Sequence, residues 1–168
     1  DHTFVYTSAV RRVRKLIDDG DIGDLLYYDS TRINLGLFQH DVDVIWDLAV
    51  HDISILTYLT KEKPVAVSAQ GHCNVPGQSM NVAFITLMFG ANTIAHVNVN
   101  WLAPVKIRRT LIGGSKKMIV YDDLEPTEKI KIYDKGVTIA RNVSEIQQMR
   151  VAYRIGDMYA PTLEPTEA

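Results

Sequence analysis

The chain has 168 residues, of which 46 % are hydrophobic and 23 % charged, and its formal net charge is −2. This length and composition suit one globular domain with a sizeable core, and the dispersed basic residues argue against a nucleic-acid partner. No apolar run approaches the ~20 residues that a membrane-spanning helix needs, and the first residues lack the features of a secretion signal, so we expect no membrane segment.

The single cysteine, Cys73, cannot form an internal disulfide, which fits a reducing compartment. We therefore expect a cytoplasmic protein. Both ends look truncated, because the chain lacks an initiator Met and residues 163–168 have the proline and acidic residues of a helix start with no helix after them. We expect residues 1–168 to be one domain of a longer protein, cut at both ends.

Two helices and a strand are predicted in the first third of the chain. Thr7 or Ser8 can cap a helix that ends near Gly20, since apolar residues recur there every three or four positions. Residues 25–35 are rich in β-forming side chains and predict a strand. A polar connection leads to a second helix over residues 44–59, on which Leu48, Ile55 and Leu59 can point inward. The opposite stripe of this helix is expected to border a cleft and contains Asp47, His51, Ser54 and Tyr58.

From Lys63 onward the pattern changes to successive strands, separated by turns rich in glycine and proline. The predicted strands cover residues 65–71, 82–89, 93–101, 106–112, 118–122 and 129–134. Short connections between consecutive strands imply mostly antiparallel pairing. The predicted fold class is therefore α+β, with helices packed on one face of a large, mainly antiparallel, open sheet.

The predicted strand 93–101 has one polar face, because His96, Asn98 and Asn100 alternate with apolar residues. This face can simply meet water. Together with the apolar Ile94, Ile107 and Leu111, it can also pack against a second copy of the chain. Both possibilities stay open on the sequence alone.

Asp47 and His51 are the leading candidates for chemistry, because a spacing of four brings two side chains to the same face of a helix. A carboxylate beside an imidazole can orient the ring and support its charged form, which equips histidine to move a proton. The simpler interpretation is a solvated helix pair.

Two other classes of function compete with proton transfer at this pair. His40, Asp41, Asp43, Asp47 and His51 bring oxygen and nitrogen ligands into twelve residues, as in a metal-dependent hydrolase or isomerase. However, no third ligand is clearly supplied elsewhere. In the other alternative the chain is a non-catalytic dimerisation module, and the Asp47–His51 pair is structural.

A resemblance to a known family favours the first hypothesis. The segments 3–10, 20–23 and 32–34, followed by Trp46-Asp47-Leu48-Ala49-Val50-His51-Asp52, resemble the C-terminal half of the glucose–fructose oxidoreductase / inositol dehydrogenase (Gfo/Idh/MocA) family. Residues 101–113 continue the likeness, which covers nearly the whole chain. Members of that family join a Rossmann domain, which binds NAD or NADP, to an α/β domain with an open sheet that contacts substrate and often forms the oligomer interface.

The resemblance implies that Asp47 and His51 match the catalytic carboxylate and histidine. His51 would take a hydroxyl proton while hydride leaves the same carbon for NAD or NADP, and Asp47 would orient and balance the imidazole. The Rossmann domain is absent here, because no Gly-x-Gly-x-x-Gly follows an N-terminal strand. Glu62-Lys63-Pro64 matches the letters of the family's lysine motif but follows the His51 helix, so we interpret it as a surface turn. We expect no cofactor to bind this chain alone, and no activity from it.

Five further residues are candidate substrate contacts, because they lie near segment ends that the family places around the cleft. They are Tyr6, Arg32, Asn34, Trp101 and Lys106. Each has a simpler interpretation: core or interface aromatics for the two rings, solvated charges for Arg32 and Lys106, and a turn former for Asn34. The expected substrate is a small sugar, an inositol or a sugar nucleotide, and the likeness also implies a homo-oligomer formed through the sheet.

Overall fold

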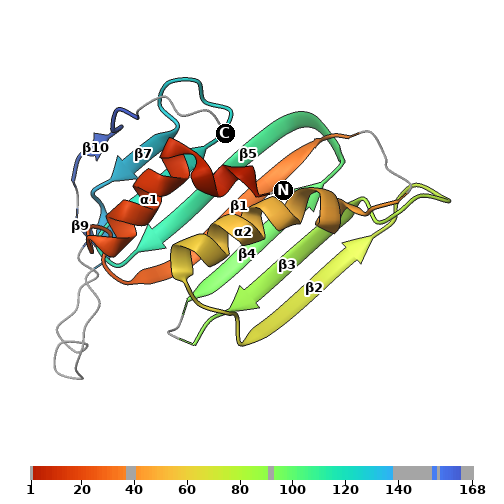
Figure 1. Cartoon of the computed structure of the whole chain (residues 1–168), viewed down its shortest axis with the longest axis horizontal. Coiled ribbons are helices and arrows are strands. Elements are labelled where there is room, and N and C mark those ends of the chain that lie inside the picture. The colour runs from red at the N-terminus through yellow and green to blue at the C-terminus, as the bar shows by residue number, and fades with distance from the viewer. Residues whose placement is uncertain (1, 37–40, 91–92, 138–152, 155, 164–168) are drawn as a thin grey trace.

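An eight-stranded sheet with two helices on one face forms the body of the domain (Figure 1). The structure, a computed structural model, describes residues 2–36, 41–90, 93–137, 153–154 and 156–163. The strands of the large sheet are β1 (Leu25–Leu35), β2 (Ala66–His72), β3 (Val82–Met88), β4 (Ile94–Asn100), β5 (Leu102–Gly114), β6 (Met118–Asp122), β7 (Ile130–Tyr133) and β10 (Met158–Tyr159). A second, small sheet pairs β8 (Gly136–Val137) with β9 (Tyr153–Arg154).

The strand order is β10-β7-β6-β5-β1-β4-β3-β2. β1 lies in the middle, antiparallel to β5 and parallel to β4, whereas the other pairings within the described residues are antiparallel. The predicted α+β class, with helices on one face of a mainly antiparallel open sheet, is confirmed. The parallel β1–β4 pair was not predicted, because its partners are far apart in the sequence.

The helical segments are η1 (Thr3–Tyr6, a 3₁₀ turn), α1 (Ser8–Asp18), η2 (Ile45–Ala49, a π turn) and α2 (Val50–Thr60). Thr7 caps α1, since its Oγ1 accepts a hydrogen bond from the Val10 amide at 3.4 Å. The single helix predicted over 44–59 is wrong in one respect: its first turn is π-helical, and regular α-helix begins only at Val50.

β5 is longer than predicted and runs through Pro104, which was expected to separate two strands. Proline has no amide hydrogen to donate, so it is tolerated where a ladder is interrupted. The register between β1 and β5 does shift between Ile33 and Leu35, opposite this part of β5. The other predicted strands agree with the structure to within one or two residues at each end, but the short strands β8, β9 and β10 were not predicted.

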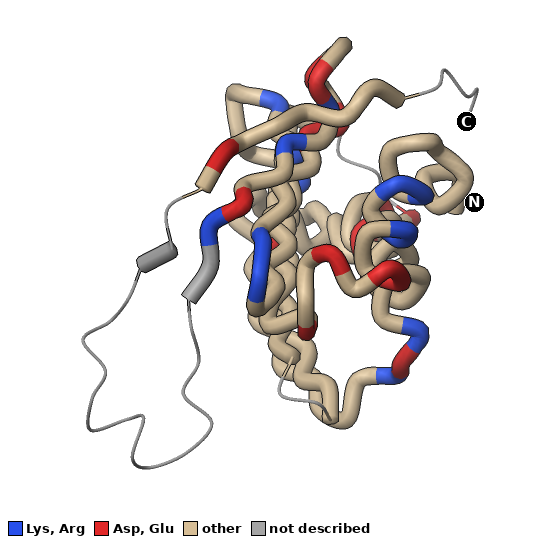
Figure 2. Tube along the Cα trace, turned by 90° about the vertical axis from the view of Figure 1, so that its left-hand side faces the viewer, with Lys and Arg blue, Asp and Glu red and all other residues tan. Residues whose placement is uncertain are grey.

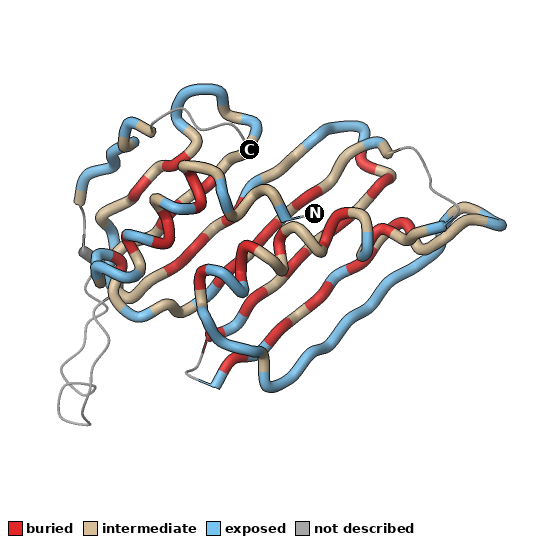
Figure 3. The backbone as a smooth tube through the Cα atoms, in the orientation of Figure 1, coloured by how far each residue is buried: buried red, intermediate tan, exposed pale blue. Residues whose placement is uncertain are grey.

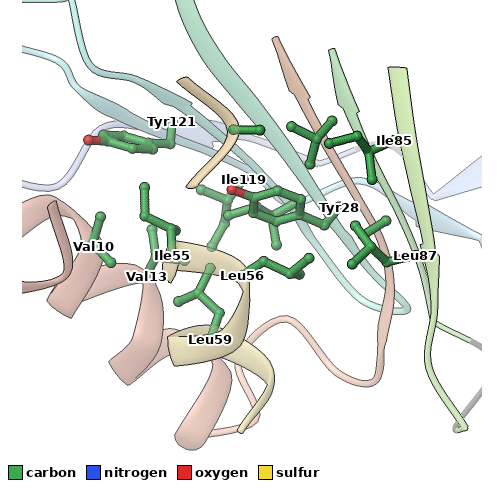
Figure 4. Close-up of a cluster of buried hydrophobic side chains, with 14 of the residues drawn as sticks. Val10, Val13, Tyr28, Ile55, Leu56, Leu59, Ile85, Leu87, Ile119 and Tyr121 are labelled. Carbon is green, nitrogen blue, oxygen red and sulfur yellow. The ribbon is translucent and has the colours of Figure 1, made fainter. Parts of the chain in front are cut away.

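The core lies between the helices and the sheet. Val10 and Val13 of α1 and Ile55, Leu56 and Leu59 of α2 are each at most 1 % exposed. Figure 4 shows these side chains meeting Tyr28 of β1 and apolar residues of β3 and β6. The three inward positions predicted for the second helix, Leu48, Ile55 and Leu59, are all buried.

The opposite face of the sheet carries no helix within the described residues (Figures 1 and 3). The predicted alternation in β4 is confirmed, because Ala95, Val97 and Val99 are buried while the side chains between them are not. On this open face, His96 Nδ1 lies 3.1 Å from Asp29 Oδ1, and the imidazole stacks on Phe84. The edge strand β2 is exposed along its whole length.

Charged residues of both signs are interspersed along the chain (Figure 2). Within the part of the chain that the structure describes, no helix is both long and apolar enough to cross a membrane.

Candidate active site

The π turn η2 joins the connection after β1 to α2, and it determines the directions in which the Asp47 and His51 side chains point relative to one another. Asp43 begins the turn by accepting the amides of Ile45 and Trp46 on its Oδ1, each at 3.0 Å. The turn closes when the Val50 amide donates to the Ile45 carbonyl, five residues back instead of four. A single π turn rotates the residues after it relative to a regular helix, and such turns are frequent at functional sites.

The direct contact predicted between Asp47 and His51 is not made. The Asp47 carboxylate instead accepts a hydrogen bond from the indole Nε1 of Trp101, at 2.9 Å. Among the described residues, no ion pair within 4.0 Å joins Asp47 to an imidazole. The extra residue in the π turn explains the difference, because positions four apart then no longer lie on one face. Asp47 is therefore held by the end of β4 and not by its own helix.

Trp101 was a candidate substrate contact, and the structure gives it another position. Its side chain is only 1 % exposed, and its hydrogen-bond donor points to Asp47. The Trp101 carbonyl accepts the Gly36 amide at 2.9 Å, and a Cβ on Gly36 would lie 2.7 Å from the indole ring. Trp101 thus packs against Gly36 at the end of β1, and its side chain is too deeply buried in this domain to contact a substrate.

His51 packs in the first turn of α2 against the aromatic ring of Phe4. The two ring centroids are 5.1 Å apart with an interplanar angle of 66°, an edge-to-face arrangement. His51 Nδ1 is buried without a hydrogen-bond partner in the described structure. Burial lowers the pKa of the imidazole below its ordinary value of 6.5, and the nearby charge of Arg32 lowers it further. A neutral imidazole can accept a proton near pH 7.

Arg32 was also a candidate substrate contact, but its guanidinium is buried in an ion pair with Asp52. Arg32 and Asp52 are 4 % and 2 % exposed, and Arg32 Nε lies 2.6 Å from Asp52 Oδ2. Ser30 adds a third bond to the carboxylate, with Oγ 2.7 Å from Oδ1. Although burial alone would lower the pKa of the guanidinium, the Asp52 carboxylate raises it above the ordinary value.

Asp52 was missed by the sequence analysis, although the pattern contains a signal for it. It lies on the inward stripe of the second helix with Leu48, Ile55 and Leu59, at spacings of four and three. A carboxylate on an apolar stripe must find a buried cation, because an unpaired buried charge is very costly.

The remaining candidate contacts lie apart from one another. Asn34 is half-buried near the end of β1, and Lys106 is exposed on β5 beside the register shift. Tyr6 is 61 % exposed and lies on η1. Of the five candidate contacts, Arg32 is connected to His51 by Phe4, whose ring contacts both the Arg32 guanidinium and the His51 imidazole.

An open, mostly apolar groove of about 700 Å³ runs between η1 and α2. The exposed rings of Tyr6, Trp46 and Tyr58 border it, together with Ser54. This agrees with the predicted cleft for Ser54 and Tyr58, whereas Asp47 and His51, the other two residues of that predicted stripe, are not among the residues that line the groove. The groove is lined by His2, Val5, Tyr6, Ile45, Trp46, Val50, Ile53, Ser54, Thr57 and Tyr58.

The metal-site alternative finds no support in the part of the chain that the structure describes. There, no group of three or more His, Cys, Asp or Glu side chains is placed to hold a metal ion. His40, which belonged to the predicted cluster, lies outside the described residues.

Comparisons with known proteins agree with the predicted family and fold. The family model described as the GFO/IDH/MocA C-terminal domain matches residues 10–120, which is more than half of the chain. The chain therefore belongs to the GFO/IDH/MocA family and corresponds to its C-terminal domain. A curated relative, the UDP-N-acetylglucosamine 3-dehydrogenase of Acidithiobacillus ferrooxidans, is 29 % identical over 125 residues, covering 74 % of this chain and 39 % of that protein.

Solved structures show the same fold at low sequence identity. An oxidoreductase from Magnetospirillum magnetotacticum superposes with a TM-score of 0.76 at 21 % identity, covering 99 % of this chain and 50 % of that one. The WlbA dehydrogenase of Bordetella pertussis, in complex with NADH and UDP-GlcNAcA, gives a TM-score of 0.66 at 14 % identity, covering 73 % and 39 %. The chain thus spans half or less of the length of these proteins.

Proposed function

We propose that this chain is the substrate-side domain of an NAD(P)-dependent dehydrogenase that oxidises a secondary hydroxyl of a sugar nucleotide. The observation that carries the proposal is His51, a half-buried histidine with a lowered pKa, four residues after Asp47 in a chain that belongs to this family. The sugar-nucleotide class is supported by the name of the curated relative and by the nucleotide sugar bound to the WlbA dehydrogenase. Free sugars and inositols are the other substrates compatible with the family.

In the proposed reaction, His51 accepts the proton of the substrate hydroxyl. The lowered pKa keeps the imidazole neutral at physiological pH, so its lone pair is available to act as the base. The bound dinucleotide supplies the hydride acceptor. Asp47 acts at longer range than the sequence suggested, because Trp101 holds its carboxylate while its charge still favours the imidazolium.

In this proposal the chain does not bind a dinucleotide by itself. The Gly113-Gly114-Ser115 segment forms the hairpin turn between β5 and β6, closed by the Gly114 amide bonding to the Lys117 carbonyl at 2.9 Å, and not a phosphate loop before a helix. We propose that the cofactor is held by a separate nucleotide-binding domain of the whole protein. Titration of the 168-residue chain with NADH, followed by fluorescence, should then show no saturable binding.

The test of the proposed function uses the full-length parent protein with UDP-N-acetylglucosamine and NAD or NADP. We expect His51→Ala to reduce turnover by about 10²–10⁴-fold, the usual scale for the loss of a positioned acid–base group. Asp47→Asn should reduce turnover less, because Asp47 does not contact the ring.

His72→Ala is the matched control, since His72 is an exposed histidine at the end of the edge strand β2. Its turnover should remain within about two-fold of wild type. If His51→Ala retains near-normal turnover and the same pH profile, His51 is not the base and this function is wrong.

We further propose that two copies of the domain associate through the open face of the sheet. Exposed Phe84, Met88 and Ile94 lie there on neighbouring strands, and a solvent-facing apolar sheet surface is a ready isologous interface. Ile94→Lys should shift the sedimentation coefficient toward the monomer. Leu124→Lys is the control, because Leu124 is similarly exposed, 41 % against 43 %, but lies in the turn after β6. A strictly monomeric wild type would refute this assembly.

A further inference from the structure

The Arg32–Asp52 ion pair is buried beneath the helix that carries His51. Arg32 contributes Nε and Nη2 to the two carboxylate oxygens of Asp52, at 2.6 and 3.3 Å. Ser30 bonds the same carboxylate, and Thr110 of β5 bonds Ser30 in turn, at 3.4 Å. The pair therefore fixes the first turn of α2 to the two central strands of the sheet.

Stability alone is a poor explanation for such a pair. Removing two charges from water costs much of what their attraction returns, and well-packed apolar residues in their place are often equally stable. Buried charged groups whose pKa values are perturbed are instead enriched at functional sites. A role beyond folding is therefore worth testing.

Phe4 connects the ion pair to the candidate base. The central carbon of the Arg32 guanidinium lies 4.6 Å from the centroid of the Phe4 ring, and the Phe4 ring meets His51 edge-to-face. Arg108 approaches the same ring at 5.9 Å and is tied to Asp123 at 3.2 Å. Phe4 is thus held over Arg32 and forms a wall against the imidazole, which has no other orienting contact through Nδ1 in the described structure.

We propose that Arg32 is a positioning residue for His51. Its guanidinium, held by Asp52, keeps Phe4 packed against the imidazole and places a positive charge near that imidazole. This inference rests on the proposed function, because it explains how His51 is prepared to act as a base. It replaces the direct substrate contact that the sequence analysis assigned to Arg32.

The charges that face His51 oppose one another. Arg32 of β1 and His2, just before η1, disfavour the protonated ring, while Asp52 beside it and Asp47 of the π turn favour it. After burial, Arg32 has the largest influence on the pKa of His51. Neutralising Arg32 and neutralising Asp52 should therefore change the protonation of His51 in opposite directions.

The test is an NMR titration of the His51 imidazole in the 168-residue chain. We expect Arg32→Gln to raise the pKa of His51 and Asp52→Asn to lower it. Simple loosening of the structure would move both variants the same way, upward toward 6.5, the ordinary value from which the pKa is lowered in the folded chain. Opposite shifts therefore distinguish positioning from a general structural role.

Arg14→Gln is the matched control. Arg14 is also a buried arginine, 8 % exposed, that pairs with an aspartate and bonds the end of α2, but it faces Asp18 and not His51. This variant should leave the pKa of His51 unchanged. If the single variants at the buried pair do not fold, Phe4→Leu is compared with Arg14→Gln: loss of the ring that Arg32 contacts should raise the pKa of His51, whereas loss of the Arg14 pair should not, and equal shifts in both variants would indicate general loosening and overturn the inference.

Parallel shifts of the Arg32 and Asp52 variants, or no shift in any variant, would overturn the inference. The result is separate from the activity test, since the titration reports the surroundings of His51 whether or not the residue is the base. If His51→Ala leaves turnover intact while the opposite shifts occur, the proposed function fails but the electrostatic link stands.

Discussion

Replacing Trp101 by phenylalanine tests the idea that the end of β4 holds Asp47 in place. The change removes the indole donor, which lies 2.9 Å from the Asp47 carboxylate, and leaves a smaller ring in a site that is 1 % exposed. A hydrogen bond to a charged group contributes about 1.5–3 kcal/mol, and the shrunken ring adds about 1 kcal/mol of lost packing. We therefore expect the free energy of unfolding to fall by roughly 2–4 kcal/mol in a urea titration.

Trp46→Phe provides a control within the same protein. Trp46 lies next to Asp47 in the chain but is 71 % exposed, so its replacement should change stability by no more than about 0.5 kcal/mol. A double-mutant cycle of Trp101→Phe with Asp47→Ala should show a coupling of about 1–3 kcal/mol. Equal losses for the two tryptophans, or a coupling near zero, would refute the reasoning.

Three further predictions concern other parts of the fold. Lys61 ends α2 with a left-handed φ of 57°, so Lys61→Gly should raise the free energy of unfolding by about 0.5 kcal/mol, despite losing one exposed ion pair, as thermal denaturation can show. Gly23→Ala should destabilise more than Gly20→Ala, because both have positive φ but only at Gly23 would the new Cβ clash with Ser115 Oγ; equal melting temperatures would contradict this. Since the folded chain lowers the pKa of His51, the unfolded chain binds the extra proton first as the pH falls below 6.5, so stability should rise with pH in that range. His51→Phe should flatten this rise in denaturant titrations at several pH values, and an unchanged slope would rule out the assignment.

The periodic parts of the fold could be predicted because burial imposes a repeat on the sequence. Alternation in residues 93–101 placed Ala95, Val97 and Val99 on the covered face of the sheet, as the structure has them. The same alternation puts Trp101 on that face, so its burial was already encoded in the strand pattern. The resemblance, which assigns Trp101 to the cleft, pointed the other way.

The site itself was harder to predict, because its contacts join distant segments. Arg32 can pair with Asp52 only when β1 and α2 are adjacent. The sequence around either residue does not indicate which residue will be its partner. The π turn is invisible to a helical repeat, since it adds one residue without changing the apolar pattern on either side. Asp47 and His51 were therefore recognised as a motif, while the contact between them was wrongly inferred from ideal α-helical spacing.

The position of β1 has a consequence for the order in which the domain is assembled. β2, β3 and β4 form one run of sequential hairpins, and β5, β6 and β7 form another. β1 comes first in the chain, but both of its partner strands come much later. Tyr28 pairs with Ala95 of β4 on one side and with Ile112 of β5 on the other. Closing these long loops costs more entropy than forming either run. The strand that bears Arg32 should thus dock late in folding, and the surroundings of His51 become complete only when the two halves of the sheet are joined.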